Sequence, residues 1–111
     1  MQDRFKFRHW DKRINKMFYP ERNDNFSYYV NNSDIIETMQ CTGLKDKNGK
    51  LIYEGDVVKD DHEALHQVKW CYNGFELYPL FKDGYTIGIV NDEIEVIGSI
   101  YENPELLEVE K

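Results

Sequence analysis

The sequence predicts a mainly β domain, a small barrel or roll with an N-terminal β-hairpin and a short C-terminal helical turn. Three observations support this fold class. Roughly six to eight short strand-like segments alternate with turns rich in Gly and Asn. The length of 111 residues suits a single core. The hydrophobic content of 41% and aromatic content of 14% argue against disorder.

The N-terminal hairpin is predicted from alternation. Apolar and basic residues alternate over residues 5–10, which is the period of a half-buried strand. Residues 16–19 provide the returning strand, and Pro20 ends it because proline cannot donate to a strand ladder. In this interpretation Phe5 and Phe7 face the core, while Lys6 and Arg8 lie on an exposed strand or pair with the acidic C-terminal segment.

The chain after this hairpin is expected to form the body of the domain. Residues 21–34 are rich in Asn and Asp, so that a loop and a short irregular strand are both open there. We treat residues 1–111 as a single domain. Within it, residues 1–34 form the hairpin with its irregular segment, and residues 35–111 form the barrel.

The central strands follow from β-branched residues and turn signals. Residues 35–41 read as a strand, residues 45–50 as a turn, and residues 51–53 and 57–58 as two short strands joined at Gly55. Glycines at 43, 49 and 55 permit turn geometry. The carboxylates of Asp46 and Asp56 are expected to accept backbone N–H groups and fix these turns.

The clearest signal is a second hairpin over residues 68–78 with an Asn73-Gly74 turn. Extended segments are predicted at residues 85–90 and 94–101. Residues 103–108 predict one helical turn with Asn103 as its N-cap. The predicted barrel core is formed by five residues, Tyr53, Val57, Val58, Val68 and Trp70.

Charge is unevenly distributed along the chain, whose formal net charge is −7. Residues 1–16 hold six basic and two acidic side chains, whereas residues 92–111 hold seven acidic side chains and one lysine. No apolar run approaches the ~20 residues that span a bilayer, and no secretory leader is evident. A cytoplasmic protein without membrane association is expected. Cys41 and Cys71 are interpreted as reduced, largely buried thiols.

One segment matches a metal-site motif. His62, Glu63 and His66 form H-E-x-x-H, which on a helix binds zinc through two histidines one turn apart while the glutamate activates water. The segment lies between two predicted strands, with little room for a helix. His9 and Glu76 are the candidates for a third ligand. A zinc hydrolase is therefore a remote alternative, and a solvated loop between strands is favoured.

The basic N-terminal hairpin suggests a second alternative. Its interleaved aromatic and basic residues could stack on and neutralise a single-stranded nucleic acid. The sequence pI near 4.9 disfavours this, because most of the surface would repel phosphates. No nucleophile elbow, phosphate loop or dinucleotide fingerprint is present in the sequence. We expect a non-enzymatic protein with no cofactor and no catalytic, cofactor-binding or metal residues.

Residues 42–58, TGLKDKNGKLIYEGDVV, resemble the YopX protein family of bacteriophages and prophages. Residues 5–11 with Lys16 and Met17 are similar to the family's opening, and residues 96–107 to its ending. The resemblance implies an SH3-type barrel, and a phage or prophage accessory protein located in a bacterial host. It implies no activity, substrate or site. The expected role is binding of a host or phage protein, and assembly of several copies stays open.

Overall fold

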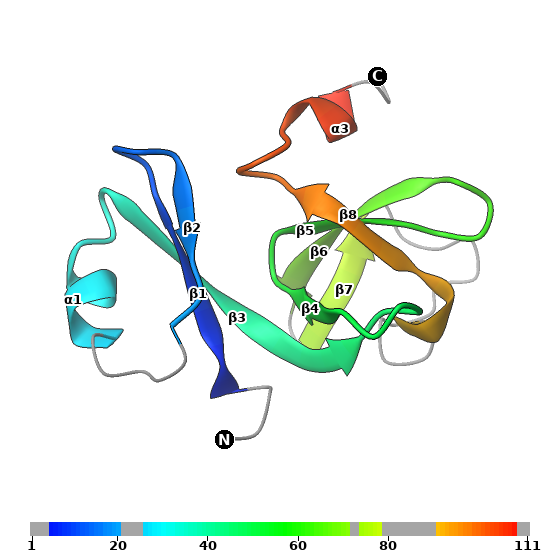
Figure 1. Cartoon of the computed structure of the whole chain (residues 1–111), viewed down its shortest axis with the longest axis horizontal. Helices are drawn as coiled ribbons and strands as arrows, with labels where there is room; N and C mark the ends of the chain where they lie inside the picture. Colours follow the sequence, from blue (N-terminus) through cyan, green and yellow to red (C-terminus); the bar gives the residue numbers. More distant parts are fainter. Residues whose placement is uncertain (1–4, 21–25, 72–73, 79–90, 109–111) are drawn as a thin grey trace.

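The computed structural model describes residues 5–20, 26–71, 74–78 and 91–108. Within them, two four-stranded antiparallel sheets stand side by side (Figure 1). Their strand orders are β2-β1-β3-β4 and β7-β6-β5-β8. The prediction of a mainly β fold is confirmed, whereas the SH3-type assignment and the division at residue 35 stay predictions.

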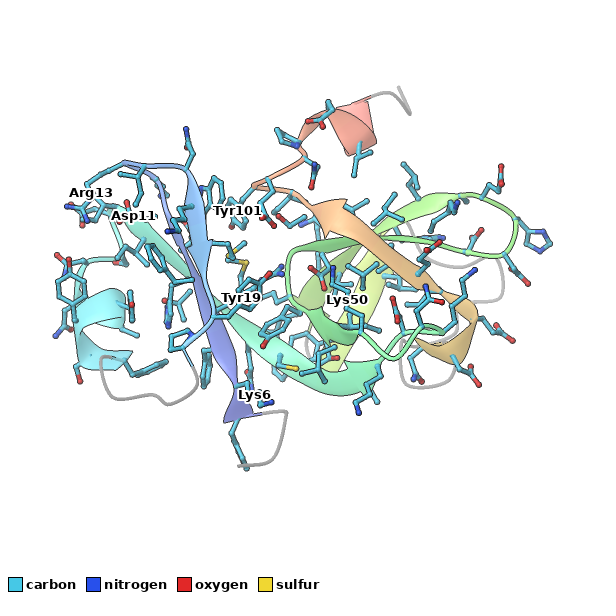
Figure 2. The ribbon with its side chains drawn as sticks, viewed as in Figure 1. Lys6, Asp11, Arg13, Tyr19, Lys50 and Tyr101 are labelled. Carbon is cyan, nitrogen blue, oxygen red and sulfur yellow. The ribbon has the colours of Figure 1, made fainter. Side chains whose placement is uncertain are left out.

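The N-terminal hairpin is confirmed. Strand β1 (Phe7–Asp11) pairs with β2 (Lys16–Phe18), with His9 opposite Phe18 and Asp11 opposite Lys16. The turn is fixed by Asp11, whose Oδ1 accepts the backbone N–H of Arg13 at 2.9 Å. The Arg13 guanidinium also donates to Asp11 Oδ2 at 2.9 Å (Figure 2). An Asx turn therefore closes this hairpin.

The segment after the hairpin corrects the prediction of a loop or irregular strand, because Phe26–Asn31 forms helix α1. The Phe26 ring packs against Phe7 with centroids 4.9 Å apart, and Tyr29 stacks on His9 at 3.8 Å. Tertiary packing of these rings on the sheet stabilises a helix that its Asn-rich surroundings do not favour.

Strand β3 (Ile36–Lys45) is longer than predicted and runs from one sheet region to the other (Figure 1). Its first half pairs with β1, from Asp11 opposite Ile36 to Phe7 opposite Gln40. Its second half pairs with β4 (Leu51–Tyr53), and the register shifts between Cys41 and Lys45. Gly43 adopts φ +83° inside this irregularity. A glycine bulge thus lets one strand serve two partners.

The second sheet contains β5 (Asp56–Lys59), β6 (Leu65–Cys71), β7 (Gly74–Tyr78) and β8 (Glu95–Ser99). The hairpin predicted over residues 68–78 is confirmed, with Trp70 opposite Phe75 and Cys71 opposite Gly74. Residues 72–73 of its connection lie outside the described residues, as does the strand predicted at residues 85–90.

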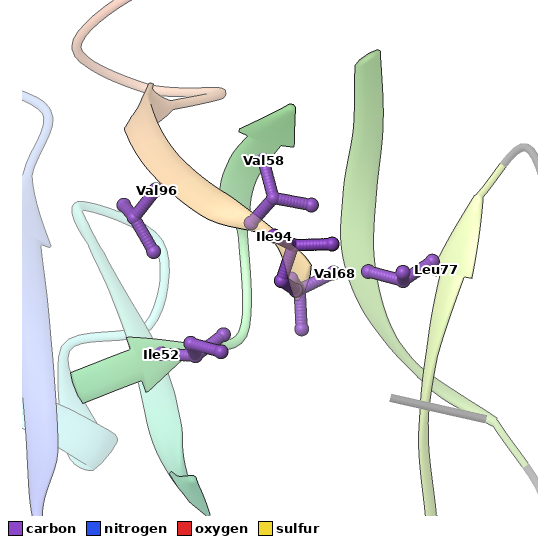
Figure 3. Packing of buried hydrophobic residues seen from close by; sticks show 6 residues of the cluster. All are labelled: Ile52, Val58, Val68, Leu77, Ile94 and Val96. Atoms are coloured by element: carbon purple, nitrogen blue, oxygen red, sulfur yellow. The ribbon is translucent and has the colours of Figure 1, made fainter. Parts of the chain in front are cut away.

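The second sheet and β4 enclose an aliphatic cluster (Figure 3). It consists of Ile52, Val58, Val68, Leu77, Ile94 and Val96. Tyr53, Val57, Val58 and Val68 are buried, as predicted, and Cys41 is a buried free thiol. Trp70 contradicts the prediction, because 57% of it is exposed. Val68 and Trp70 share a face of β6 by alternation, but the core ends before Trp70 is reached.

The two predicted carboxylate turns are confirmed. Asp46 Oδ1 accepts the N–H groups of Asn48 and Lys50, each at 2.9 Å, and its Oδ2 accepts the Val96 N–H at 2.8 Å. Asp56 Oδ2 accepts the Tyr53 N–H at 2.7 Å. Both carboxylates replace missing backbone partners at the ends of short strands.

The C-terminal helical turn is confirmed as α3 (Glu105–Glu108), and a 3-10 turn, η2 (Asn91–Glu93), precedes β8. Asn103 precedes the helix as predicted, and its carbonyl accepts the Leu106 N–H at 3.1 Å. Its side chain differs from the predicted N-cap, because Oδ1 accepts the Ser99 N–H at 3.3 Å instead of an N–H of the helix. Within the described part of the chain, no helix has the length and apolar character that crossing a bilayer requires.

Candidate binding groove

The H-E-x-x-H segment forms a turn and the start of a strand. Glu63 has φ +64°, which a helix does not accommodate, and β6 begins at Leu65. The His62 side chain is 88% exposed, whereas His66 is buried and its Nε2 lies 2.8 Å from Asp60 Oδ2. The two histidines therefore do not share a helical face, and the zinc-hydrolase alternative lacks its geometry.

Asp60 explains how this turn is built. Its Oδ1 accepts the backbone N–H groups of His62 at 2.8 Å and Ala64 at 2.9 Å. Burial raises the pKa of Asp60, but the hydrogen bonds from His66 and these two amides outweigh it and hold the pKa below its usual value. The pair Asp60–His66 thus links β5 to β6 as a structural clamp.

The predicted orientation of the basic N-terminal hairpin is wrong at Phe5 and at Arg8. Arg8 is 2% exposed, whereas Phe5 is 47% exposed. Lys6 and Phe7 are half-buried. Because Arg8 is withdrawn from the surface, this hairpin cannot present the basic pair that the nucleic-acid alternative requires.

Arg8 instead joins the two sheets. Its Nη1 lies 2.8 Å from Asp56 Oδ1, and both side chains are almost fully buried. Its Nη2 donates to the Glu54 carbonyl at 3.0 Å, and its guanidinium lies 4.9 Å from the centre of the Tyr53 ring. A planar guanidinium can make all these contacts at once. The contact fixes the position of β1 relative to the β4–β5 turn.

An inter-sheet groove lies beside this contact, between β3 and β6. Its volume is about 270 Å³. Its lining includes Glu37, Thr38, Glu54, Gly55, Lys69, Trp70 and Tyr101. They come from both sheets and from the turn after β8, so the groove depends on the relative position of the two sheets, to which the Arg8–Asp56 contact contributes.

Gly55 forms part of the groove wall and cannot readily be replaced. Its N–H donates to the Val68 carbonyl and its carbonyl accepts the Ile100 N–H, each at 2.9 Å. Its φ is +87°, and a Cβ placed there would lie 3.1 Å from Met39 Sδ. Both the backbone conformation and the close approach of Met39 therefore favour glycine.

Tyr101 lies in the space between the two sheets (Figure 2). Its ring stacks on that of buried Trp10 with centroids 5.9 Å apart. Burial raises the pKa of Tyr101, and the nearby carboxylates of Glu37 and Glu54 raise it further. The groove therefore combines an aromatic surface with two carboxylates, Glu37 and Glu54, and one lysine, Lys69.

Two strand edges border the groove. Ile35, just before β3, accepts the Lys12 N–H, and Cys41 of β3 donates to the Lys6 carbonyl, so these groups point toward the chain of β1. Alternation along β3 therefore directs the N–H and C=O of Thr38 to the other side. In β6, the Val68 carbonyl accepts the Gly55 N–H and so points toward the β5 side of the strand. Trp70 is two residues further along, so its N–H and C=O point to the same side. Among the described residues, no strand pairs with Thr38 or Trp70 on these sides.

A sequence profile described as YopX protein matches residues 20–108. The chain belongs to the YopX family. The match includes β3, β6 and the turn after β8, so the groove is built mainly by the part of the chain that the YopX match covers. Among curated proteins, no relative matches.

Two solved structures share the fold of this YopX-family chain. Protein EF1440 from Enterococcus faecalis has a TM-score of 0.68 at 26% identity, over 92% of this chain and 96% of that one. Protein yopX from Bacillus subtilis has a TM-score of 0.64 at 23% identity, over 93% and 98% of the two chains. The resemblance stated from residues 42–58 is thereby confirmed.

Sequence reasoning missed the groove because its residues are distant in the chain. Glu37, Thr38 and Tyr101 carry no motif, and Trp70 was assigned to the core. The one available signal was Trp70 itself, which lies at the end of β6 next to the hairpin turn, where a core side chain has few neighbours.

Proposed function

We propose that this YopX-family chain is a non-enzymatic phage or prophage accessory protein that binds another protein through the inter-sheet groove. The observation that carries the proposal is the exposure of Trp70, 57% of which faces solvent beside the groove. Tryptophan and tyrosine dominate the energetics of protein interfaces, especially beside pockets. The proposed partner is a protein of the phage or of its bacterial host, met in the cytoplasm.

The surroundings of Trp70 support binding over a purely structural role. Its ring contacts Phe75 edge-on across the hairpin at 4.8 Å, which orients the indole without burying it. An oriented aromatic ring loses little side-chain entropy when a partner covers it. Trp70 is thus a pre-positioned contact residue at the rim of a groove.

The proposal of a non-enzymatic role rests on how the titratable groups are used. His66 and Asp60 clamp a turn, and Arg8 and Asp56 join the sheets. His9 is buried, with Nδ1 2.9 Å from Thr38 Oγ1. Each of these groups already has a structural partner, and none of them lies in the groove.

The test is affinity capture from a bacterial host that carries the phage or prophage. We expect the wild-type chain to retain a specific protein and Trp70→Ala to lose it. The matched control is Tyr28→Ala, which removes an aromatic residue of similar exposure, 51%, from α1. Equal capture by Trp70→Ala and wild type would show that the groove is not the site. Turnover in a substrate screen, with no protein retained, would contradict the proposal as a whole.

A further inference from the structure

We propose that the groove binds an extended, basic segment of the partner by strand addition: the segment pairs with the free edge of β3 at Thr38 and inserts a lysine or arginine side chain beside Trp70 and Tyr101. This inference rests on the proposed function, because it specifies the ligand of the same groove. It commits to one occupant, a peptide segment in β conformation with a positive charge.

The backbone argument comes first. Thr38 lies in β3 between residues whose N–H and C=O groups bond to β1, so its own groups point into the groove. Beyond Thr38, Gln40 already accepts a bond from the Glu54 N–H at 2.9 Å on that side. The free edge is therefore short and ends at Glu54. An incoming strand that adds to such an edge satisfies backbone groups that otherwise bond only to water.

Trp70 gives a second backbone edge across the same groove. Its N–H and C=O point toward the β5 side of β6, and β5 begins only at Asp56, which is too late in the chain to pair with Trp70. In a helix the N–H and C=O groups bond to one another, so a helical ligand could pair with neither strand edge. An extended segment can pair with one edge while its side chains reach the other.

The charge argument identifies the side chain. Glu37 and Glu54 line the groove with a single lysine, Lys69, so carboxylates outnumber cations in its lining, and both carboxylates raise the pKa of the Tyr101 hydroxyl. Lys12 lies 3.2 Å from Glu37, but both side chains are more than 40% exposed. Such a surface pair is weak and can be exchanged for a ligand cation. The whole chain, with a net charge of −7, also attracts a basic segment.

The aromatic residues and the volume agree with this choice. Cations bind favourably over the faces of tryptophan and tyrosine, and Trp70 and Tyr101 both line the groove. A volume of about 270 Å³ is near the lower limit of small-molecule pockets and suits one long side chain. Aromatic and carboxylate groups together select an ammonium or guanidinium over a neutral side chain.

The experiment is selection from a displayed library of random nine-residue peptides on three proteins. These are the wild type, the groove variant Glu37→Gln with Glu54→Gln, and the control variant Asp61→Asn with Glu93→Gln, which neutralises two exposed carboxylates outside the groove. The wild type and the control should enrich lysine or arginine at one position, flanked by β-branched or aromatic residues. The groove variant should bind those peptides about tenfold more weakly.

Strand addition is tested on the best enriched peptide. N-methylation of the peptide bond opposite Thr38 removes the backbone donor and should also weaken binding about tenfold, whereas N-methylation at the neighbouring residue should not. In ¹⁵N-correlation spectra, binding should shift the amides of Thr38 and Trp70. Replacing the basic residue by acetyl-lysine keeps the length but removes the charge, and should weaken binding similarly.

Several results would overturn the inference. Enriched peptides without a basic position, equal binding of N-methylated peptides, or amide shifts confined to α1 would each do so. Enrichment of no peptide, with Trp70→Ala still losing its host protein, would overturn strand addition and leave the proposed function standing. Selective peptide binding with no protein captured would support the groove chemistry and contradict the proposed cellular role.

Discussion

The two sheets are stabilised by different chemistry. The first sheet buries charged and polar side chains, with Arg8, His9 and Asp11 each no more than 5% exposed. The second sheet, with β4, encloses an aliphatic cluster in which Val58, Val68 and Leu77 are 0% exposed, and its buried Asp60–His66 pair lies outside that cluster. Burial of aliphatic surface is insensitive to pH, whereas buried ion pairs and histidines depend on protonation and on both partners being present. The position of the first sheet, which depends on Arg8, Asp56 and His9, is therefore more sensitive to protonation than the aliphatic cluster is.

The largest effect is expected at the contact between the sheets. Arg8→Ala leaves Asp56 buried without its cation, which should lower the free energy of unfolding by about 3–5 kcal/mol. Urea denaturation monitored by circular dichroism measures it. The double variant Arg8→Met with Asp56→Asn removes both charges, keeps a side-chain oxygen that can accept the Tyr53 N–H, and should recover part of the loss. If the single and double variants were equally unstable, packing and not the unpaired carboxylate would be the cause.

The aliphatic core should respond slightly less. Leu77→Ala removes a fully buried side chain and should cost about 3 kcal/mol. The loss should be the same at pH 7 and pH 5, since no titratable group belongs to the cluster. A strongly pH-dependent loss, measured by the same denaturation, would contradict the separation of the two sheets by chemistry.

The wall of the groove is tested by a pair of glycines. Gly55→Ala meets a positive φ and Met39 Sδ at 3.1 Å, and should cost about 2 kcal/mol. Gly49→Ala is the control, because its φ of +83° is similar and nothing lies within 4 Å of the added Cβ. Its cost should be about 1 kcal/mol. The difference in thermal midpoint isolates the contact with Met39; equal shifts would show that conformation alone matters.

The pH dependence of the first sheet is expected from His9. Burial lowers its pKa from 6.5 to about 4, so the folded protein keeps it neutral while the unfolded chain protonates. The resulting stability is complete above pH 6.5 and falls by about 1 kcal/mol per pH unit as the pH drops toward 4. Melting curves of His9→Phe should lose this slope, and those of exposed His62→Asn should keep it. An unchanged slope in His9→Phe would assign the dependence to another group.

Most of the fold could be predicted, for reasons visible in particular residues. The two hairpins and the carboxylate turns at Asp46 and Asp56 depend on local sequence, which alternation and Asx turns report. Helix α1 was missed because its stability comes from the packing of Phe26 and Tyr29 on β1, which no local pattern encodes.

The groove could not be predicted because it depends on long-range contacts. Arg8 is basic in an alternating strand, so its position indicates solvent, and only its burial against Asp56, forty-eight residues later, reverses that interpretation. Thr38 and Trp70 border one groove because the pairing of β4 with β3 begins only at Cys41 and β5 begins only at Asp56. Among the described residues, no strand therefore pairs with either residue on the groove side. This meeting is set by the arrangement of the sheets, which periodicity within one strand does not contain.

The smallest effect on stability should be at the residue with the largest proposed role in binding. Trp70→Ala removes an exposed ring and one edge contact with Phe75, so it should cost less than about 1 kcal/mol. Denaturation curves of this variant should nearly overlay those of the wild type, while retention of the partner is lost. A larger destabilisation would mean that Trp70 is a packing residue of the second sheet. The contrast with Leu77→Ala, on the neighbouring strand of the same hairpin, therefore separates a side chain that stabilises the fold from one kept for a partner.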